Sequence, residues 1–447
     1  MMRLLRTPGG VVVAVLGLVG IAVIGGSIAV VEAVVAFIAP ALLGVVGLVV
    51  LIRHVISQDD PALQRRVLRW TLAAFGAHLV VGAIVIGVDT PLFSALRGDE
   101  AAYHGIAKEI LRHWEDGFPM PRVPPGREGF YYVVAALYRV FGPYKVAALA
   151  YNATVAAAIV PLITEITARL FGKPACRYAT ILASVMPGLF LWTSLPLKEA
   201  TVLFLICVAA LGGVRMADRI TFTAFAVLTL PLAMLLTFRG YVGFVFALTL
   251  VIGVMLSRRQ LLTGVSTAVG ALALLSVLVF TVGLGYSGYR STTDADLRDA
   301  NIARQDLATS AASGFHTNVD ISSPKRALTY LPAGVVNFAF GPYPWQVRGL
   351  RQLPALPDVL AIFLLLPALC RGIATGWRRQ GRRVLLLLLP ASTLAMLLAL
   401  VIGNYGTLVR ERCQVVVLLL PFAALGLAER RTFRSDSTTL GDHAPPT

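Results

Sequence analysis

Long apolar stretches separated by short charged segments make up most of this chain. An α-helix needs about 20 apolar residues to cross a hydrocarbon core about 30 Å thick. The stretches that approach this length are 11–31, 33–52, 70–88, 146–168, 178–194, 200–214, 220–237, 241–256, 261–285, 354–370, 384–403 and 413–428. The pattern therefore predicts an all-α polytopic membrane protein with about 12 transmembrane helices. The first stretch is longer than the apolar core of a cleaved signal peptide, so we expect a retained span.

Composition supports a membrane protein and excludes several other classes. The 447 residues are 57% hydrophobic and 14% charged, whereas soluble domains are about 45–50% apolar and about 25% charged. The net charge of +16 is typical of nucleic-acid binders, but the Lys and Arg residues form short clusters between apolar runs. Such clusters orient spans in a membrane. We therefore expect membrane lipids, and no nucleic acid, as partners.

The basic clusters predict one topology. With a cytoplasmic N-terminus, every predicted cytoplasmic segment is basic, and both termini lie in the cytoplasm. We divide the chain into a two-span extension with its loop (1–69), a transmembrane domain (70–428) and a disordered cytoplasmic tail (429–447). The short outside loops then contain few basic residues, which are Lys198, Arg239, Arg410 and Arg412.

Two long loops, 89–145 and 286–357, lie outside in this topology. Residues 101–114 place apolar side chains on one helical face, and 129–141 are apolar but too short to span. Both segments are predicted to be interfacial helices. Residues 290–326 are polar with mixed charge, and we expect them to be mobile.

Asp99 and Glu100 are the first candidates for chemistry. Adjacent carboxylates at a membrane surface repel each other and lose water, which makes one of them a better proton acceptor. They are also a ligand set for a divalent cation. The structural alternative is an acidic helix start, because carboxylates favour the N-terminal end of the helix dipole.

Lys198 and Glu199 occupy the short outside turn SLPLKEA. A lysine there departs from the charge rule and is suited to bind a phosphate as a point charge. The alternative is a lysine that reaches the interface and pairs with its neighbour.

Arginines in two further outside turns depart from the same rule. Arg239 precedes Tyr241 in FRGY, and Arg410 and Arg412 lie in GNYGTLVRER. Guanidinium groups suit phosphate or pyrophosphate, although pairing with lipid headgroups or Glu411 would explain them too. Because these charged turns lie on one membrane face, the pattern favours a shared site.

An aromatic stretch, LPAGVVNFAFGPYPWQ, closes the second long loop and includes Trp345. Its rings could stack on a sugar or dock the loop in the interface. The sequence contains no GxSxG, HExxH or P-loop motif, and its cysteines form no CxxC pair. No cofactor is therefore implied, apart from a divalent cation at the acidic pair.

Residues 70–428 resemble the GT-C-fold glycosyltransferases, the polytopic enzymes that include protein O-mannosyltransferases and lipid A aminoarabinose transferases. GDEAAYHGIAKEI is similar to their Asp-Glu motif in the first outside loop. FYYVVAALYRVFGPYKVAALAYNATVAAAIVPLITEITARLFG resembles the interfacial helix and span that follow. SLPLKEA, FRGY, FAFGPYPWQ and GNYGTLVRER are similar to a less characterised bacterial branch.

The resemblance implies transfer of a hexosyl or pentosyl group from a polyprenyl-phosphate donor to an acceptor, with inversion at the anomeric carbon. The acceptor would lie on the outer face of a bacterial cytoplasmic membrane, in cell-envelope glycan or glycolipid synthesis. Asp99 would be the general base, and Glu100 would orient the acceptor or a cation. The remaining implied roles are donor-phosphate binding by Lys198, Arg239, Arg410 and Arg412, and substrate binding by Tyr103, Glu199, Tyr241 and Trp345.

Two other functions remain open. A polymerase or ligase of lipid-linked oligosaccharides would also use outside arginines, against a diphosphate, but would not need Asp99. A transporter or flippase would carry ionisable residues near the middle of its spans. Here charged residues lie near the span ends, as Glu165 does.

Overall fold

The computed structural model describes residues 28–56, 60–258, 260–294, 296–310, 313–347 and 349–441. These residues form helices joined by short connections, and their only β-type pairing is a single bridge between Gly314 and Asn404. The all-α architecture is therefore confirmed. Most of the predicted first span, 11–31, lies outside the described residues.

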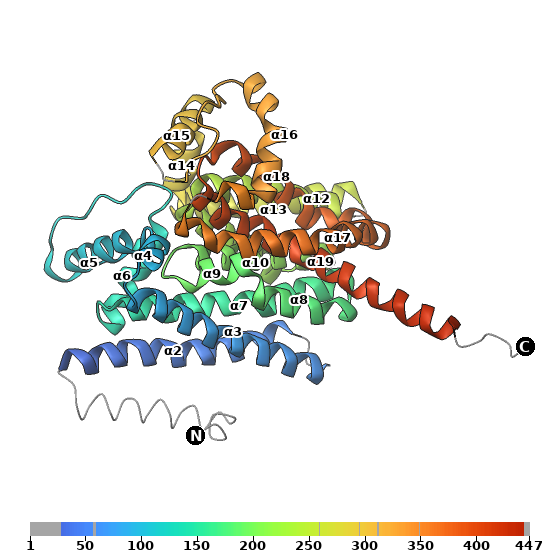
Figure 1. Cartoon of the computed structure of the whole chain (residues 1–447), viewed down its shortest axis with the longest axis horizontal. Helices are drawn as coiled ribbons and strands as arrows, with labels where there is room; N and C mark the ends of the chain where they lie inside the picture. The colour runs from blue at the N-terminus through green and yellow to red at the C-terminus, as the bar shows by residue number, and fades with distance from the viewer. Residues whose placement is uncertain are drawn as a thin grey trace, which may run out of the picture.

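Every predicted span from 33–52 onward falls on a helix or on a bent pair of helices (Figure 1). The pair is α8 and α9, which meet at 47° before Pro187. The helices are α2 (Ile28–Val55), α3 (Pro61–Gly87), α7 (Lys145–Phe171), α8 (Lys173–Val185), α9 (Pro187–Ser194), α10 (Glu199–Asp218), α11 (Phe222–Phe238), α12 (Gly240–Ser257), α13 (Leu261–Ser276) with its continuation η2 (Val277–Thr281), α17 (Leu356–Gln380), α18 (Leu385–Val401) and α19 (Tyr405–Gly441).

By length and composition, 8 helical segments of the described residues can cross a membrane, or 9 if the bent pair counts as one span. One segment, Gln352–Val401, contains both α17 and α18. Gly381 separates these two helices with φ 53°, a left-handed conformation that ends an α-helix. With 17 residues, α11 is too short to be counted. The chain is a multi-pass membrane protein, and the total of about 12 spans stays a prediction.

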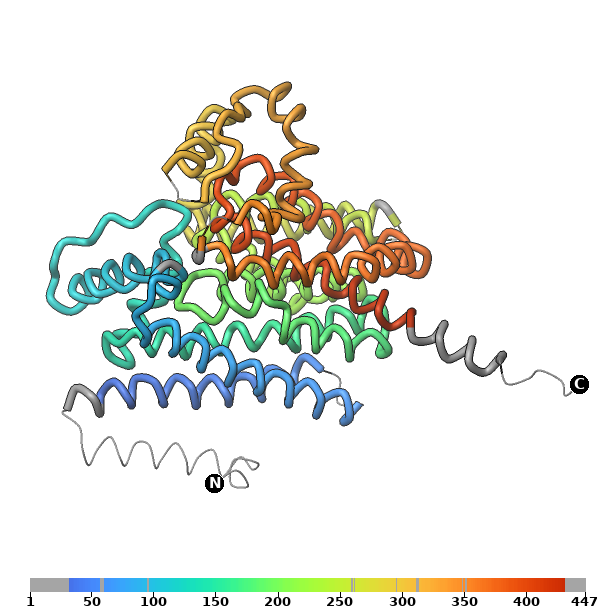
Figure 2. The backbone as a smooth tube through the Cα atoms, in the orientation of Figure 1, coloured from blue at the N-terminus to red at the C-terminus, as the bar shows by residue number. Residues whose placement is uncertain are grey.

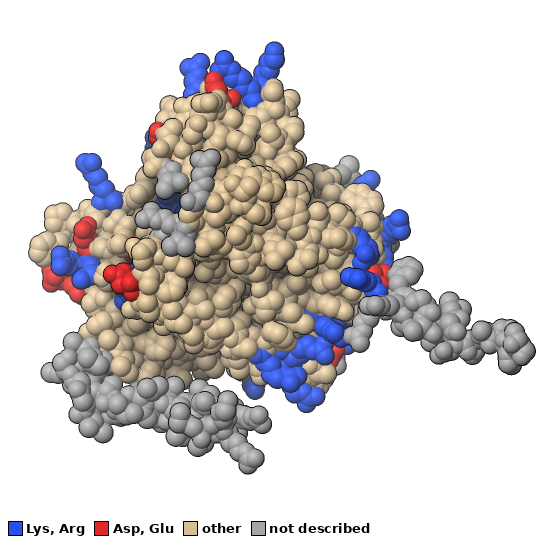
Figure 3. Space-filling view, in the orientation of Figure 1, with Lys and Arg blue, Asp and Glu red and all other residues tan. Residues whose placement is uncertain are grey.

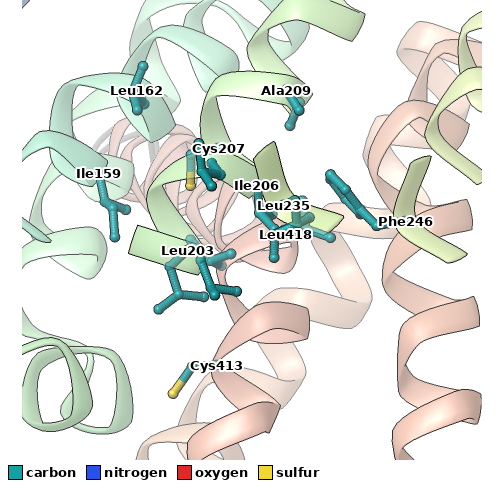
Figure 4. Packing of buried hydrophobic residues seen from close by; sticks show 14 of the residues in the cluster. Ile159, Leu162, Leu203, Ile206, Cys207, Ala209, Leu235, Phe246, Cys413 and Leu418 are labelled. Carbon is teal, nitrogen blue, oxygen red and sulfur yellow. The ribbon is translucent and has the colours of Figure 1, made fainter. Parts of the chain in front are cut away.

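Three spans form the centre of the bundle. In α7, α10 and α19, 83%, 78% and 78% of the most apolar window is buried, against 28% in α2 and in α13. Figure 4 shows Leu203 and Ile206 of α10 packed among Leu235 of α11, Phe246 of α12 and Leu418 of α19. The outer helices α2 and α13 therefore expose most of their apolar surface, as lipid-facing helices do.

Small residues allow α17 and α19 to approach closely. A Cβ atom added to Gly372 would lie 1.8 Å from the Phe422 carbonyl oxygen, and one added to Gly426 would lie 1.8 Å from that of Ala368. Close backbone approach at glycines is a common way to pack helices in membranes, where dispersion replaces the hydrophobic effect.

The predicted first outside loop contains helices at the expected positions. Its helices are α4 (Pro91–Arg97), α5 (Glu100–Asp116) and α6 (Gly129–Phe141). Tyr103, Ala107 and Ile110 of α5 are buried, and Trp114 stacks on Tyr132 of α6 with ring centroids 6.5 Å apart. The predicted amphipathic face of 101–114 and the short helix at 129–141 are confirmed.

Two segments are more ordered than the sequence predicts. Residues 290–326, expected to be mobile, include the end of α14 (Tyr286–Thr293), all of α15 (Leu297–Ser310) and the start of α16 (Pro324–Phe340). Buried Arg304 donates to the Tyr330 hydroxyl at 3.1 Å and anchors α15 to α16. At the C-terminus, α19 continues to Gly441, so the expected disordered tail begins as helix. The Arg379–Glu429 ion pair at 2.9 Å supports this extension, and 442–447 lie outside the described residues.

Charged side chains gather at two ends of the molecule. Figure 3 shows them at the left and top and at the right and lower right, with an uncharged band between. The ion pairs respect this division. Lys173–Asp60 and Arg169–Asp218 join predicted cytoplasmic segments, whereas Arg410–Asp99 joins outside ones. Among the described residues, no ion pair links the two sets. This supports the prediction that each set of segments lies on its own face of the membrane.

Candidate functional site

The charged outside turns converge on one cluster. Asp99 precedes α5, Glu199 begins α10, and Arg239 lies between α11 and α12. Arg410 and Glu411 lie in the first turns of α19. These segments are far apart in the sequence, but their ends lie on the same face of the bundle. The prediction that distant outside turns share a site is therefore supported by their geometry.

Arg410 links the exposed and buried halves of the cluster. Its Nη1 lies 3.2 Å from Asp99 Oδ2, and its Nε lies 3.2 Å from Glu199 Oε1. The Asp99 side chain is 56% exposed, that of Arg410 18% and that of Glu199 3%. The cluster therefore opens to solvent at Asp99 and closes toward α10.

Arg239 occupies the dry end of the cluster between two carboxylates. Its Nη2 donates to Glu199 Oε1 at 2.9 Å, and its Nη1 lies 2.9 Å from Glu411 Oε1. The Tyr241 hydroxyl donates to the second Glu411 oxygen at 2.9 Å. Burial alone would lower the pKa of Arg239, but the charge of Glu411 raises it above its ordinary value. Arg239 is therefore a permanent cation that both of its neighbours already neutralise.

Lys198 lies next to this cluster, before the first residue of α10. Its side chain is buried, and it forms no hydrogen bond or ion pair within the part of the chain that the structure describes. Burial, then the positive charge of Arg239, lowers its pKa to about 7, and Arg127 acts in the same direction. The charges of Glu199 and Glu411 oppose this shift. Such an amine can accept a proton when an anion arrives.

Tyr103 borders the cluster on α5. Its ring packs against Phe130 and Tyr131 with both centroid distances at 4.9 Å. Burial, followed by the negative charges of Glu199 and Asp99, raises the pKa of its hydroxyl. The phenol therefore stays protonated and can donate a hydrogen bond at the edge of the site.

Glu100 points away from Asp99. Its Oε1 lies 2.8 Å from Lys145 Nζ at the start of α7, and its side chain is buried beside His104 and Tyr138. The two carboxylates thus serve different cations. Within the described residues, no group of three or more His, Cys, Asp or Glu side chains is placed to hold a metal ion. Because the two carboxylates contact different cations, they do not form a shared ligand pair here, and the divalent cation expected at this pair stays a prediction.

Two other predicted site residues lie apart from the cluster. Arg412 is buried on another face of α19, where it donates to the Gly341 carbonyl at 2.7 Å and to Asp358 at 2.8 Å. Trp345 is 77% exposed in the second loop and stacks on Tyr343 at 5.0 Å. The structure thus gathers seven predicted residues and leaves out Glu100, Arg412 and Trp345; the seven are Asp99, Tyr103, Lys198, Glu199, Arg239, Tyr241 and Arg410.

Two residues of the cluster lack a clear sequence signal. From the sequence, Glu411 is only an alternative ion-pair partner for the arginines of its own turn. In the structure it contacts Arg239 and accepts a hydrogen bond from Tyr241. Arg127 approaches because the connection from α5 to α6 arches toward α14, as Figure 2 shows. There the Gly240 N–H donates to the Gly126 carbonyl at 3.1 Å. Only the folded connection reveals this proximity.

The arrangement places a base beside a cation that keeps one donor group unused. Asp99 uses only one carboxylate oxygen for Arg410, and the Nη2 group of Arg410 forms no hydrogen bond within the described residues. An exposed carboxylate can take a proton from a hydroxyl group while the adjacent guanidinium binds an anion. Such a pair suits transfer of a group away from a phosphate.

Neither a protein-family model nor a curated protein sequence matches this chain. Among solved structures, it is similar to ArnT from Cupriavidus metallidurans bound to undecaprenyl phosphate, with 14% identity and a TM-score of 0.46. It is also similar to the archaeal oligosaccharyltransferase AglB from Archaeoglobus fulgidus in complex with an inhibitory peptide and a dolichol-phosphate, with 13% identity and a TM-score of 0.47.

The matches cover 79% of this chain with ArnT and 85% with AglB. They cover 60% of ArnT and 52% of AglB, so the chain spans little more than half the length of these proteins. With TM-scores below 0.5, these likenesses assign neither a fold nor an activity to this chain.

Proposed function

We propose that the protein is a membrane glycosyltransferase that moves a hexosyl or pentosyl group from a polyprenyl-phosphate donor to an acceptor. The reaction would take place on the outer face of a bacterial cytoplasmic membrane, in the synthesis of a cell-envelope glycan or glycolipid. The contact between Asp99 and Arg410 carries this proposal. It places a solvent-accessible base beside a cation with an unused donor group.

Asp99 is the proposed general base. The acceptor hydroxyl attacks the anomeric carbon, a new C–O bond forms, and the bond from that carbon to the phosphate oxygen breaks. The electron pair leaves with the phosphate, and the hydroxyl proton passes to the free Asp99 oxygen. Attack from the side opposite the leaving group inverts the anomeric carbon. This step needs only the donor and the acceptor.

Arg410 and Lys198 are the proposed ligands of the departing phosphate. Arg410 has a free Nη2 group, and Lys198 is a buried amine without a partner among the described residues. Fixed cations stabilise the charge that develops on a leaving group, especially where water is excluded. Binding of the phosphate would also favour the charged form of Lys198.

Arg239 has a different proposed role from the one that the sequence suggests. Two buried carboxylates already neutralise it, so a phosphate would have to displace one of them. We assign Arg239 as a positioning residue, which holds Glu199 and thereby Arg410. Glu199 and Tyr241 support the same framework, while Tyr103 remains the proposed substrate-binding donor. The sugar-binding role of exposed Trp345 stays a prediction.

The test uses purified protein in nanodiscs with a panel of radiolabelled polyprenyl-phosphate sugars. We expect sugar transfer with release of the carrier phosphate, and loss of transfer by about 100-fold or more in Asp99→Asn, in line with the effect of a general base. Asp116→Asn is the matched control, because Asp116 is exposed at the other end of α5. It should leave transfer unchanged.

Other outcomes would contradict the proposal. Transfer only from diphosphate-linked oligosaccharides, independent of Asp99, would indicate a polymerase or ligase. Movement of an intact lipid-linked sugar across the membrane without bond cleavage would indicate a transporter. Full activity of Asp99→Asn on a monophosphate donor would remove Asp99 from the mechanism.

A further inference from the structure

A polar cavity lies at the end of the bundle opposite the Asp99 cluster. It has a volume of about 910 Å³ and lies between the end of α10, the α12–α13 connection and the turn from α17 to α18. In Figure 1 the ends of α12 and α17 lie at the right, away from α5. Its lining residues are Ala217, Asp218, Ser257, Arg258, Gln260, Thr263, Arg379, Gln380, Arg382 and Arg383.

Positive charge is in excess in this cavity. Among the described residues, four arginines line it, and Asp218 is the only carboxylate. Asp218 is shared between Arg383 and Arg169, and Arg379 pairs with Glu429 at the rim. Arg382 is exposed and forms no ion pair within the described ranges. The cavity is therefore left with uncompensated guanidinium charge.

Several of its donors are also unused. The Nε groups of Arg258 and Arg383 are buried without a hydrogen-bond partner in the described structure. Burial lowers the pKa of Arg258; the charge of Asp218 opposes this shift, and the charge of Arg383 adds to it. Buried donors without acceptors are unfavourable, and an anion in the cavity would satisfy them.

Exposed apolar side chains lie beside the cavity, on α13. Thr263 lines the cavity at the start of α13, and another side of this helix, beginning at Leu262, carries exposed apolar side chains at helical spacing. They are Leu262, Val265, Val269 and Leu272, with exposed fractions of 85%, 41%, 59% and 41%. A ligand with an anionic head and acyl chains would match both surfaces at once.

We infer that this arginine-lined cavity binds the phosphate group of an anionic phospholipid whose acyl chains lie along α13. The ligand class follows from the guanidinium donors, which suit a phosphate diester. The lipid source follows from the position of the cavity at the ends of apolar helices, next to the exposed apolar side chains of α13. This inference is independent of the proposed transferase activity.

The experiment measures lipid binding to the purified full-length protein by native mass spectrometry. The probes are phosphatidylglycerol, phosphatidylcholine, inorganic phosphate and glycerophosphoglycerol, which is the headgroup without acyl chains. We expect the protein to prefer phosphatidylglycerol over all three. Arg382→Gln removes a guanidinium that holds no native ion pair among the described residues, and should weaken this binding about ten-fold. Arg258→Gln tests a second arginine of the cavity.

Arg378→Gln is the matched control, because Arg378 is an exposed arginine at the same end of α17 that does not line the cavity. It should bind phosphatidylglycerol as the wild type does. Equal weakening by Arg378→Gln and Arg382→Gln would show general surface charge and overturn the inference. Equal affinity for phosphatidylglycerol and either free phosphate probe would identify a soluble anion and overturn the lipid assignment. Equal affinity for phosphatidylcholine would show that the net negative charge of the headgroup is not recognised and would overturn the inference of an anionic lipid.

Discussion

Folding changes the charge state of Lys198 above neutral pH. Its pKa is about 7 in the folded protein, against an ordinary value of 10.5. Between these two values the unfolded chain binds a proton that the folded chain lacks, so stability should rise with pH across that window. Below pH 7 the full cost of charging the buried amine is present, on the order of 3–5 kcal/mol.

Lys198→Met should remove this pH dependence and be more stable than the wild type below pH 7. Thermal unfolding in detergent from pH 6 to pH 10 would measure the difference between the two proteins. Lys325→Met, at an exposed lysine of α16, is the control and should parallel the wild type. Parallel curves for wild type and Lys198→Met would show that Lys198 is charged in both folded and unfolded states.

The same titration should govern use of the donor. A phosphate is bound best by the charged amine, so donor binding should weaken as pH rises through about 7. Lys198→Arg keeps the charge at all these pH values and should move the fall in activity to higher pH. The KM for the lipid donor as a function of pH is the measurement. An unchanged profile in Lys198→Arg would exclude Lys198 from phosphate binding.

Arg239 and Arg410 should separate folding from catalysis. Arg239→Gln removes the buried cation that pairs with Glu199 and Glu411. Breaking a buried ion pair in this way typically lowers the free energy of unfolding by about 3–5 kcal/mol. Arg410→Gln removes a partly exposed cation, while Glu199 keeps its contact with Arg239. It should therefore unfold near the wild-type temperature but raise the KM for the donor. Thermal unfolding and kinetics on both variants are required, and equal loss of stability in the two would contradict this division.

The sequence predicts which turns carry charge but not where each side chain points. Consecutive helical residues are rotated by about 100°, so Asp99 and Glu100 face different partners although they are adjacent. Arg410 and Arg412 are similarly separated, because α19 begins at Tyr405 and turns the expected loop into helix. The sequence predicts that the acidic pair acts together and that the arginine pair acts together. In the structure, the two members of each pair contact different partners.

At the scale of elements, apolar length predicts the spans well because the bilayer imposes it. Polar helices lack that signal. The low hydropathy of α15 gives no sequence signal for a helix. Tertiary contacts stabilise it, chiefly the hydrogen bonds that buried Arg304 donates to the Tyr330 hydroxyl and the His316 carbonyl. Such contacts join residues that no local pattern relates, so the order of the second loop could not be read from the sequence.

Three glycines bring the α5–α6 connection and α14 into contact with the start of α12, next to Arg239 of the site. Gly126, with φ +69°, approaches Gly240 of α12 and Gly288 of α14. A Cβ atom on Gly288 would lie 1.9 Å from the Leu236 carbonyl oxygen, so Gly288→Ala must displace α14 from the end of α11. We expect a lower unfolding temperature and faster hydrogen exchange in residues 286–293.

Gly105→Ala is the control for this change. Gly105 lies within α5, and an added Cβ atom would meet nothing within 4 Å. The substitution should stabilise the helix by about 0.5–1 kcal/mol, because alanine loses less backbone freedom than glycine. If Gly288→Ala behaves in the same way, α14 is not packed against α11 as described.

At the scale of the whole molecule, the ion pairs divide the chain into two faces. Asp60, Lys173 and Asp218 belong to one set, and Asp99 and Glu411 to the other. Among the described residues, an uncharged band separates these sets on the face seen in Figure 3. A chain that crosses the membrane repeatedly must keep such sets on opposite sides, since charge within the hydrocarbon core is costly.

Single cysteines can test this division in oriented vesicles. Phe118→Cys lies in the loop after α5 and Arg378→Cys near the end of α17, both at exposed positions. Both would be made with Cys370→Ser, because Cys370 is the exposed native cysteine of the described chain. In right-side-out vesicles, a membrane-impermeant maleimide should label Phe118→Cys at once and Arg378→Cys only after permeabilisation. Labelling of both from one side would contradict the two-face arrangement. A reversed pattern would keep it but place Asp99 in the cytoplasm, where the proposed outer-face transfer could not occur.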